Sequence, residues 1–425
     1  MKPATTNEPK TAPRMRPKSP RGVTARLFTF AWLPLLLVGT LLQAVRPHAV
    51  LTEPDVAVNA EEEADPTLPV QGSISLSAKS AVLMNGKTGE VYHRKSADLR
   101  LPMASTTKIM TALVVIESIP DLSVTVSVHP DAVNVEGSSI YLYAGERVSV
   151  ETLLYALLLE SANDAAAALA YAVAGSIPAF AERMNARAEA LGLCNTHFVN
   201  PHGLYDDAHY TTAYELGCIM TEALRHECFR KIVSTKRITL PSSSGERLMI
   251  NHNRLLSTYA DCVGGKTGYT LRSGRCLVSA AERDGLLLVA VTLSAPDDWN
   301  DHKALLDYGF SLYTSVPLPD IDALSFTLPI FNGCESTVTV SYDKAVSPDH
   351  AEAITLPRDH GEITLTVELP RFLWGEVCAG DTVGYAVYRY EGAVIEKIPL
   401  TANASVPPIV YRFHLLRRIK ALLSR

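Results

Sequence analysis

The sequence has few cysteines and no paired-cysteine motif. Its seven cysteines are an odd number among 425 residues, and none stands in a Cys-x-x-Cys pair or another metal-ligand spacing. This pattern argues against a disulfide-stapled scaffold, and we expect neither a metal nor another cofactor. Cys334 and Cys378 in the C-terminal region form the one pair that the sequence leaves open as a disulfide.

The chain also lacks a large net charge and internal repeats. A formal charge of -6 gives no reason to expect a nucleic-acid partner. The apolar content of 47% is ordinary for a globular protein, and 425 residues exceed one small domain. We therefore expect two folded domains with tails.

One segment near the N-terminus has no charged residue. It runs for 19 residues from Leu27 to Val45, long enough to span a bilayer, and the 26 residues before it carry seven Lys or Arg and one acid. We expect residues 1–26 to be a basic cytoplasmic tail and 27–45 a signal or membrane anchor, either cleaved or retained. Residues 46–72, with scattered prolines, predict a linker, and the protein is expected to be exported and membrane-associated.

Two compositional regions follow the linker. Residues 73–317 predict an α+β domain, in which an antiparallel sheet has flanking helices. Its expected elements are a hairpin turning at Asn85-Gly86, helices at about 104–117, 150–174, 177–191 and 299–313, and a strand pair within 262–294 that turns at Arg283-Asp284-Gly285. Short alternating runs predict a small all-β sandwich or barrel over 318–405.

The C-terminal tail, residues 406–425, is basic and partly amphipathic. The last 18 residues hold five basic residues and no acids. On a helix, the apolar side chains share one broad face: Ile409, Phe413, Leu416, Ile419 and Leu423. This pattern predicts a helix on a membrane surface, with a frayed basic tail as the alternative.

The motif Ser-x-x-Lys occurs twice. Ser105 and Lys108 open an apolar helix, where residues three apart project from the same face and the helix N-terminus supplies positive potential. Ser341 and Lys344 stand in an alternating strand, where such residues point to opposite faces. The first copy is therefore the predicted nucleophile with its base.

The motif Lys-Thr-Gly also occurs twice. The copy at 87–89 belongs to the Asn-Gly hairpin turn, in which these residue types are ordinary. The copy at Lys266, Thr267 and Gly268 follows two glycines and leads into an apolar strand pair, so a substrate backbone can approach it closely. We assign the functional copy to 266–268.

A third motif, Ser161-Ala162-Asn163, lies between these two at a helix junction, where Ser and Asn are often only caps. The ordered trio Ser-x-x-Lys, Ser-x-Asn and Lys-Thr-Gly is typical of serine β-lactamases and penicillin-binding proteins.

From about Ser75 to Val406 the chain resembles the low-molecular-mass penicillin-binding proteins, the serine D-alanyl-D-alanine carboxypeptidases. The stretches that carry the resemblance include LRLPMASTTKIMTAL, GSSIYLYAGERVSVETLLYALLLESANDAA, FVNPHGLYDDAHYTTAYEL, GGKTGYTLRSGRCLV and VCAGDTVGYAVYRYEGAVIEKIPL.

The resemblance implies removal of the terminal D-Ala from peptidoglycan stem pentapeptides, outside the bacterial cell membrane, with β-lactams as covalent inhibitors. Ser105 would be the nucleophile and Lys108 its base, made neutral by burial and by Lys266. Ser161 would relay a proton, and Asn163 would orient Lys108 and the substrate amide.

By the same resemblance, Lys266 and Thr267 would bind the terminal carboxylate, and the backbone N–H groups of Ser105 and Tyr269 would form the oxyanion hole. Ala162 replaces the usual glycine. Relatives can carry an arginine near the Asn-x-Asn segment that precedes Lys-Thr-Gly. Here that segment is Asn251-His252-Asn253, followed by Arg254, so positive charge near the carboxylate is expected from a different place.

Alternatives remain open at this stage. A D,D-endopeptidase or a serine β-lactamase would use the same site, although none of the six glutamates between the second and third motifs stands in a recognisable loop motif. An inactive wall-binding protein is the non-enzyme alternative. A zinc site built from His197, His202 and His209 with Asp206 and Asp207 is disfavoured, because no His-x-x-x-His spacing is present.

Overall fold

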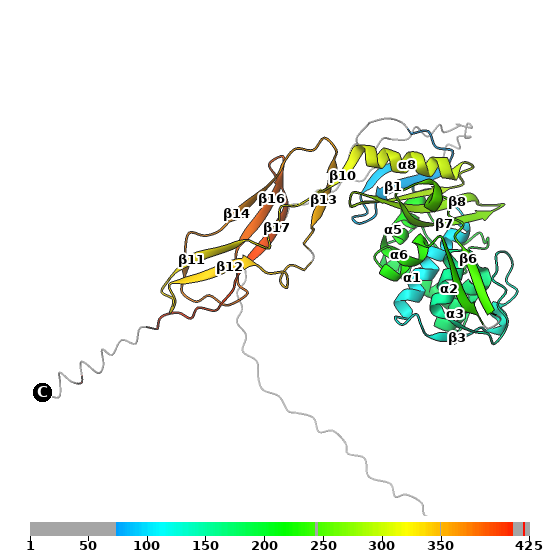
Figure 1. Cartoon of the computed structure of the whole chain (residues 1–425), viewed down its shortest axis with the longest axis horizontal. Coiled ribbons are helices and arrows are strands. Elements are labelled where there is room, and N and C mark those ends of the chain that lie inside the picture. The colour runs from blue at the N-terminus through cyan, green and yellow to red at the C-terminus, as the bar shows by residue number, and fades with distance from the viewer. Residues whose placement is uncertain (1–73, 243–244, 349, 411–419, 421–425) are drawn as a thin grey trace, which may run out of the picture. The chain divides into compact units, whose positions relative to one another are not determined.

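The computed structural model describes residues 74–242, 245–348, 350–410 and 420 (Figure 1). The basic N-terminal tail, the apolar segment 27–45 and nearly all of the last 15 residues lie outside the described residues. The expectations for these segments therefore stay predictions.

A five-stranded antiparallel sheet forms the centre of the α+β part. The strands are β1 (Ser80–Asn85), β2 (Val91–Lys95), β7 (Cys262–Thr270), β8 (Gly274–Arg283) and β9 (Leu286–Leu293), and their order is β2-β1-β9-β8-β7. Strand β7, which contains 266–268, is thus an edge strand with one side open to a peptide. The turn predicted at Asp284 and Gly285 is confirmed by their positive φ angles, 49° and 83°.

The segment 262–294 holds three strands, so the prediction of a strand pair was wrong. Thr270 pairs with Gly274, which places an additional tight turn between β7 and β8. Gly274 takes a φ of 67°, a conformation that glycine adopts without strain.

Both faces of the sheet are buried because successive side chains of each strand alternate between two cores. Val82 and Met84 pack into a large cluster with the helices on one face. Ala81 and Leu83 pack into a second cluster under helix α8 (Asp298–Leu312) on the other face.

The large core is built on helices α1 (Lys108–Ser118), α2 (Val150–Leu158), α3 (Asn163–Ala174), α4 (Ile177–Ala190), α5 (Ala213–Ala223) and α6 (Glu227–Ser234). The short elements around them are 3₁₀ turns η1 (Ala104–Thr107) and η2 (Pro130–Ala132), helix α7 (Leu255–Thr258), and strands β3 (Thr125–Ser127), β4 (Arg147–Ser149), β5 (Arg237–Ser242) and β6 (Gly245–Ile250).

The single helix predicted over 150–174 is interrupted, and this prediction was wrong. Ser161 has a φ of 59°, and the Asn163 N–H bonds to the Ser138 carbonyl at 2.7 Å. A left-handed residue cannot continue an α-helix, so α2 ends and α3 starts in a new direction. The break presents Ser161 and Asn163 at a corner.

The C-terminal part is all-β, as predicted. Its strands are β10 (Tyr313–Pro317), β11 (Ser325–Phe331), β12 (Thr337–Tyr342), β13 (Ala353–Pro357), β14 (Ile363–Glu368), β15 (Leu373–Trp374), β16 (Thr382–Tyr390) and β17 (Ala393–Ala402). Six form one sheet in the order β14-β16-β17-β12-β11-β15, and β10 pairs with β13. We call residues 313–410 the β-module; it has its own apolar core.

Two further expectations concern cysteines and membranes. Cys334 and Cys378 are both exposed free thiols, so the structure does not pair them.

Within the described ranges no single helix has the length and hydropathy of a membrane span, although α3 and α4 pass that test as a pair bent by 82°.

Candidate active site

Ser105 and Lys108 occupy one continuous turn at the start of the first helix. Ser105 lies in η1, Lys108 is the first residue of α1, and the Lys108 Nζ is 2.9 Å from the Ser105 Oγ. One helical turn therefore brings the amine against the hydroxyl.

Lys108 is completely buried, and its amine meets three oxygens. Besides Ser105 Oγ, its Nζ contacts Asn163 Oδ1 at 2.7 Å and the His202 carbonyl at 2.6 Å. Burial, reinforced by the nearby charge of Lys266, lowers the pKa of Lys108 well below its usual 10.5. A neutral amine has two N–H groups for the two carbonyl oxygens and one lone pair for the serine O–H, so this set of partners suits a base.

A loop remote in sequence holds the nucleophile turn in place. Gly203 has a φ of 87°, and a Cβ on it would stand 1.9 Å from the Ala104 carbonyl oxygen. Only glycine fits at this approach, which also places the His202 carbonyl on Lys108. The sequence carries this loop in the stretch FVNPHGLYDD, but the role of Gly203 was not predicted; its signal is the Pro201-His202-Gly203 run.

The corner between α2 and α3 brings the second motif to the same place. Lys266 Nζ donates to Ser161 Oγ at 3.0 Å, and Asn163 holds Lys108 with its Oδ1. The Asn163 Nδ2 donates to the Glu136 carbonyl at 2.5 Å, which fixes the orientation of the amide. Ser161 and Asn163 are thus joined to both lysines rather than serving as caps.

Strand β7 carries the third motif past the nucleophile. A Cβ on Gly268 would be 3.0 Å from the Ser105 backbone nitrogen, so this strand runs directly beside the serine. Lys266 is buried, and burial lowers its pKa to about 7. Thr267 is half-buried, and Tyr269 is 62% exposed at the mouth of the site.

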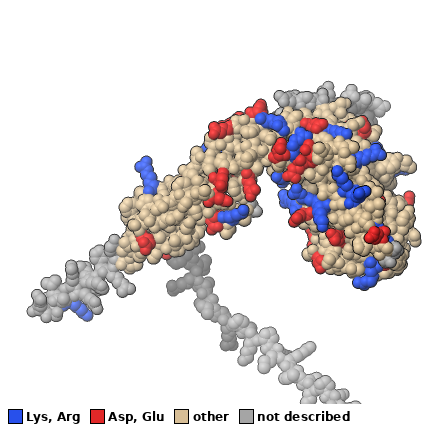
Figure 2. Space-filling view, viewed as in Figure 1, with Lys and Arg blue, Asp and Glu red and all other residues tan. Residues whose placement is uncertain are grey.

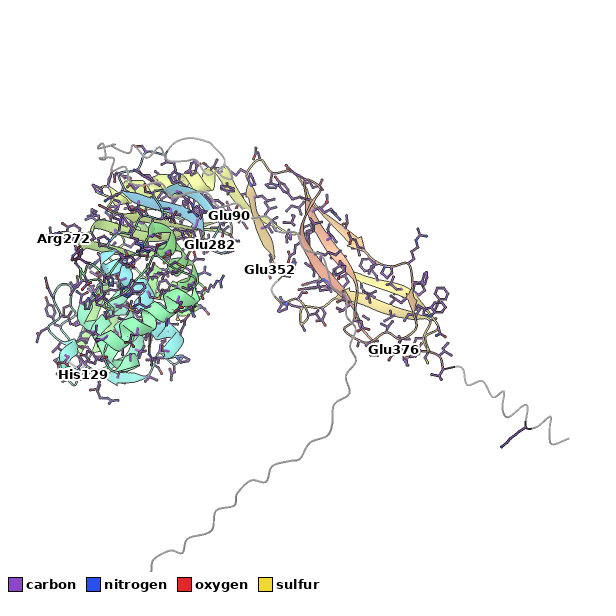
Figure 3. All side chains as sticks on the ribbon, turned by 180° about the vertical axis from the view of Figure 1, so that it is seen from behind. Glu90, His129, Arg272, Glu282, Glu352 and Glu376 are labelled. Atoms are coloured by element: carbon purple, nitrogen blue, oxygen red, sulfur yellow. The ribbon has the colours of Figure 1, made fainter. Side chains whose placement is uncertain are left out.

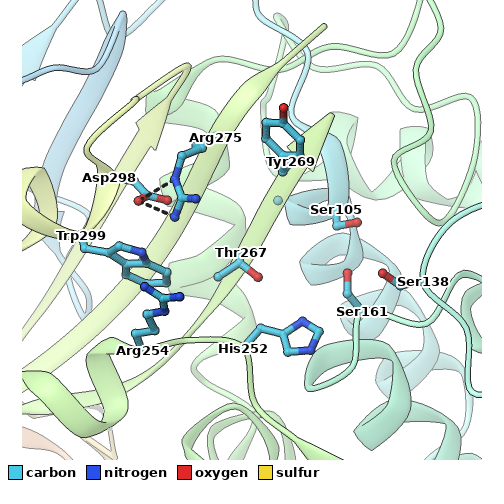
Figure 4. Close-up of a pocket in the computed structure, with 11 residues that line it drawn as sticks. Ser105, Ser138, Ser161, His252, Arg254, Thr267, Tyr269, Arg275, Asp298 and Trp299 are labelled. Carbon is cyan, nitrogen blue, oxygen red and sulfur yellow. Dashed lines mark hydrogen bonds and ion pairs between the residues drawn. The ribbon is translucent and has the colours of Figure 1, made fainter. Parts of the chain in front are cut away.

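The site opens into a cavity of about 380 Å³ (Figure 4). Its lining residues are Ser105, Ser138, Ser161, His252, Arg254, Thr267, Gly268, Tyr269, Arg275, Asp298 and Trp299. In Figure 4 the serines lie on one side of Thr267, and Arg275, Asp298 and Trp299 lie on the other. Residues of all three motifs therefore line one cavity.

Two arginines line this cavity; Arg275 was missed from the sequence, and Arg254 was noted only as the residue after Asn253. Arg275 of β8 donates through Nε and Nη2 to the buried Asp298 Oδ1 at 3.0 and 2.8 Å, and its guanidinium lies 5.7 Å from the Trp299 ring centre. Arg254 lines the same side. The positive charge expected from a different place is thus supplied by β8 and by the start of α7, and no short motif signals either residue.

The other copies of the two motifs lie away from the cavity. Ser341 is in strand β12, where its Oγ donates to Asn403 Oδ1 at 2.9 Å, and Lys344 follows the end of that strand. Lys87 and Thr88 lie in the turn after β1, where both backbone N–H groups donate to Asn85 Oδ1. Neither copy lines the cavity. The strand predicted to hold both Ser341 and Lys344 ends at Tyr342, so that part of the prediction was wrong.

The histidines of the rival zinc hypothesis have separate partners. His209 Nε2 is 2.8 Å from Thr107 Oγ1 while its Nδ1 accepts from the Val199 N–H, and His197 Nδ1 is 2.6 Å from the Ala208 carbonyl. Among the described residues no group of three His, Cys, Asp or Glu is placed to hold a metal ion. These partners give the histidines a role in holding the loop that carries Gly203.

Comparison with known proteins decides the family. The family model for D-alanyl-D-alanine carboxypeptidases, peptidase family S11, matches residues 64–297. The chain belongs to this family. Its function as a serine-type D-alanyl-D-alanine carboxypeptidase, predicted from the sequence, is thereby confirmed, and the family implies a peptide substrate ending in D-Ala-D-Ala and the binding of penicillin.

Relatives of the carboxypeptidase extend over most of the chain. It is 29% identical to the D-alanyl-D-alanine carboxypeptidase DacF of Bacillus subtilis, over 87% of this chain and 93% of that protein. It is 32% identical to the D-alanyl-D-alanine carboxypeptidase DacC of Escherichia coli, over 78% and 85% respectively.

A solved structure confirms the predicted fold of this carboxypeptidase. Penicillin binding protein 5 from Haemophilus influenzae superposes with a TM-score of 0.63 at 26% identity, covering 79% of this chain and 99% of that chain. The similarity thus includes the β-module as well as the α+β part.

Proposed function

We propose that this carboxypeptidase releases the terminal D-Ala of peptidoglycan stem pentapeptides through an acyl-enzyme on Ser105. The observation that carries the proposal is the amine of Lys108, which is buried, has a lowered pKa and lies 2.9 Å from the Ser105 hydroxyl. A weak nucleophile beside a neutral base is the arrangement that acyl transfer requires.

In the acylation step, Lys108 takes the hydroxyl proton as Ser105 Oγ attacks the carbonyl carbon of the penultimate D-Ala. Negative charge develops on that carbonyl oxygen. The backbone N–H groups of Ser105 and Tyr269 are assigned to stabilise it, and the close approach of Gly268 to the Ser105 nitrogen supports this assignment.

Collapse of the intermediate breaks the peptide bond and needs a proton on the leaving nitrogen. The proton passes from Lys108 to the departing D-Ala through Ser161, whose Oγ accepts from Lys266 at 3.0 Å. Asn163 keeps Lys108 aligned through its Oδ1. Water then attacks the acyl-enzyme, frees the shortened peptide and restores Ser105.

Three cations near Thr267 are suited to bind the free carboxylate of the substrate. One is Lys266, which precedes Thr267 on β7. The other two, Arg254 and Arg275, line the cavity beyond Thr267. Asp298 orients the Arg275 guanidinium, and charge-assisted bonds to a carboxylate are stronger than neutral ones. This cluster favours a substrate with a free C-terminus, hence carboxypeptidase over endopeptidase action.

The preference for a free C-terminus predicts an order of rates among substrates. The rate of D-Ala release from a pentapeptide, measured by mass spectrometry, should exceed the rate of cleavage of a cross-linked dimer. Amidation of the terminal carboxylate should lower kcat/KM about tenfold or more, because hydrogen bonds to a charged group contribute about 1.5–3 kcal/mol. The Arg275→Gln variant should discriminate less between acid and amide.

The control for this series is Arg272→Gln, an arginine of the β7–β8 turn whose guanidinium lies 5.6 Å from the Tyr205 ring centre. It should keep the wild-type ratio between acid and amide. Faster dimer cleavage than D-Ala release would instead make the protein an endopeptidase, and equal rates on acid and amide would remove the carboxylate site from the mechanism.

The lysine pair predicts the pH profile. Lys266 has a pKa of about 7, so raising the pH through that value removes the positive charge that binds carboxylate, and kcat/KM should fall on the alkaline side. Lowering the pH protonates Lys108, which gives the acidic limb. The Lys266→Arg variant keeps its positive charge at higher pH, so its kcat/KM should begin to fall only at a higher pH than that of the wild-type enzyme. If the fall stays at the same pH, a group other than Lys266 is responsible for it.

The acidic residues that line the cavity argue against the β-lactamase alternative. Asp298 is the one carboxylate among its lining residues, and Arg275 binds it. No lining glutamate is therefore present to activate water against a β-lactam acyl-enzyme, and we expect β-lactams to acylate Ser105 and to remain bound for long times.

We further assign this enzyme to the extracytoplasmic face of the bacterial cell membrane. The uncharged run 27–45 behind a basic tail and the five basic residues of the last 18 support the assignment.

A further inference from the structure

Three large aromatic side chains form an exposed cluster at one end of the β-module. Phe331, Phe372 and Trp374, which we call the aromatic tip, are 51%, 49% and 71% exposed. Parallel pairing of β11 with β15 puts Phe331 opposite Trp374. The Phe331 ring centre lies 5.1 Å from that of Phe372, nearly perpendicular, and 6.2 Å from that of Trp374.

The apolar surface continues from the aromatic tip onto the C-terminal segment. The Ile409 N–H donates to the Asn332 carbonyl at 2.9 Å, directly after Phe331. Ile409 and Val410 are themselves 39% and 75% exposed. A contiguous exposed patch of large apolar side chains is unusual on a soluble protein and marks an interaction site.

The chain leaves the β-module beside this patch and becomes strongly basic. Residues 411–425 carry five Lys or Arg and no acid in sequence. On the module itself, exposed Glu376, which Figure 3 labels, follows Trp374 by two residues, and exposed Glu335 follows Phe331 by four in sequence. The face of the module drawn in Figure 2 is mostly uncharged over β11 and β12. The aromatic tip therefore supplies apolar contact, and the charge is on the adjoining tail.

We propose that the aromatic tip inserts into the headgroup region of an anionic lipid bilayer, as a second attachment point beside the basic tail. This inference rests on the proposed membrane location. Aromatic side chains favour the membrane interface, where they meet both acyl chains and headgroups.

The test uses the tryptophans of the full chain, which are Trp32, Trp299 and Trp374. In the Trp32→Phe, Trp299→Phe protein, Trp374 reports alone. Vesicles of phosphatidylglycerol and phosphatidylcholine with brominated acyl chains should quench its emission about twofold and shift it to the blue, since the ring enters the interface.

The matched control moves the tryptophan to position 394, near the start of β17 and outside the aromatic tip. It carries Val394→Trp and Trp374→Phe together with Trp32→Phe and Trp299→Phe. Val394 is also about half exposed, at 51%, and a tryptophan there should stay unquenched. Replacing the aromatic tip by Phe331→Gln, Phe372→Gln and Trp374→Gln should weaken partition into these vesicles about tenfold, whereas Val394→Gln should not.

Three distinct outcomes overturn the proposal. If the protein sediments with the vesicles while Trp374 stays unquenched, the membrane location stands and the aromatic tip is excluded from it. If the triple glutamine variant instead loses binding to purified glycan strands, the aromatic tip is a sugar-binding surface. Failure of the unsubstituted protein to sediment with vesicles would refute the membrane location itself.

Discussion

The Ser105→Ala variant should neither become covalently labelled by a fluorescent penicillin nor release D-Ala from a pentapeptide at a measurable rate. The methyl group of alanine cannot attack a carbonyl, and removing the nucleophile of a serine hydrolase typically costs about 10⁶-fold in kcat. Labelling is read on a denaturing gel, and D-Ala release by mass spectrometry.

The chain provides its own control for this result. Ser341→Ala removes the hydroxyl of the second Ser-x-x-Lys copy, which lies in strand β12 and bonds to Asn403. That variant should be labelled and hydrolyse substrate at the wild-type rate. Persistent labelling of the Ser105 variant, or loss of labelling on changing Ser341, would refute the assignment of the nucleophile.

The Lys108→Met variant should fold but acylate about 10³-fold more slowly, because it removes the general base and keeps the length of the side chain. Pre-steady-state labelling with penicillin measures this step directly. Lys344→Met, at the matching position of the second copy, should acylate at the wild-type rate. A Lys108 variant that acylates normally would mean that another group deprotonates Ser105.

Lys108 also predicts a pH effect on stability. Its pKa is lowered in the folded protein, so between that value and 10.5 the unfolded chain binds more protons than the folded one. The free energy of unfolding of the wild-type protein should therefore rise relative to that of Lys108→Met as pH increases within this window. Urea unfolding at several pH values measures the difference.

Residues close in sequence were the ones that could be predicted. Ser105 and Lys108 are three residues apart, so helical periodicity alone puts them together. The strand predicted to hold both Ser341 and Lys344 ends at Tyr342, so only Ser341 lies in it. The continuous apolar runs of β1 and β9 likewise predict strands, because turn residues bound them. The division of the chain into residues 73–317 and 318–405 stays a prediction.

Residues whose position depends on distant contacts could not be predicted. The helix expected over 150–174 breaks at Ser161, and directly after the break the Asn163 N–H bonds to the distant Ser138 carbonyl. Nothing in the local sequence predicts the positive φ of Ser161. Arg275 joins the cavity because Asp298, 23 residues later, binds it after α8 packs on the sheet. Gly203 contacts Ala104 across nearly a hundred residues.

By itself, the sequence determined the family and the α+β and all-β parts, because these follow from motif order and local periodicity. Which copy of each motif carries the chemistry stays a prediction. The resemblance implied a neutral Lys108, but only the tertiary structure shows which contacts bury the two lysines. Burial of Lys108 among oxygens 55 and 94 residues away, and of Lys266 against Ser161, lowers their pKa values. Burial is a property of packed, distant segments, so no short motif contains it.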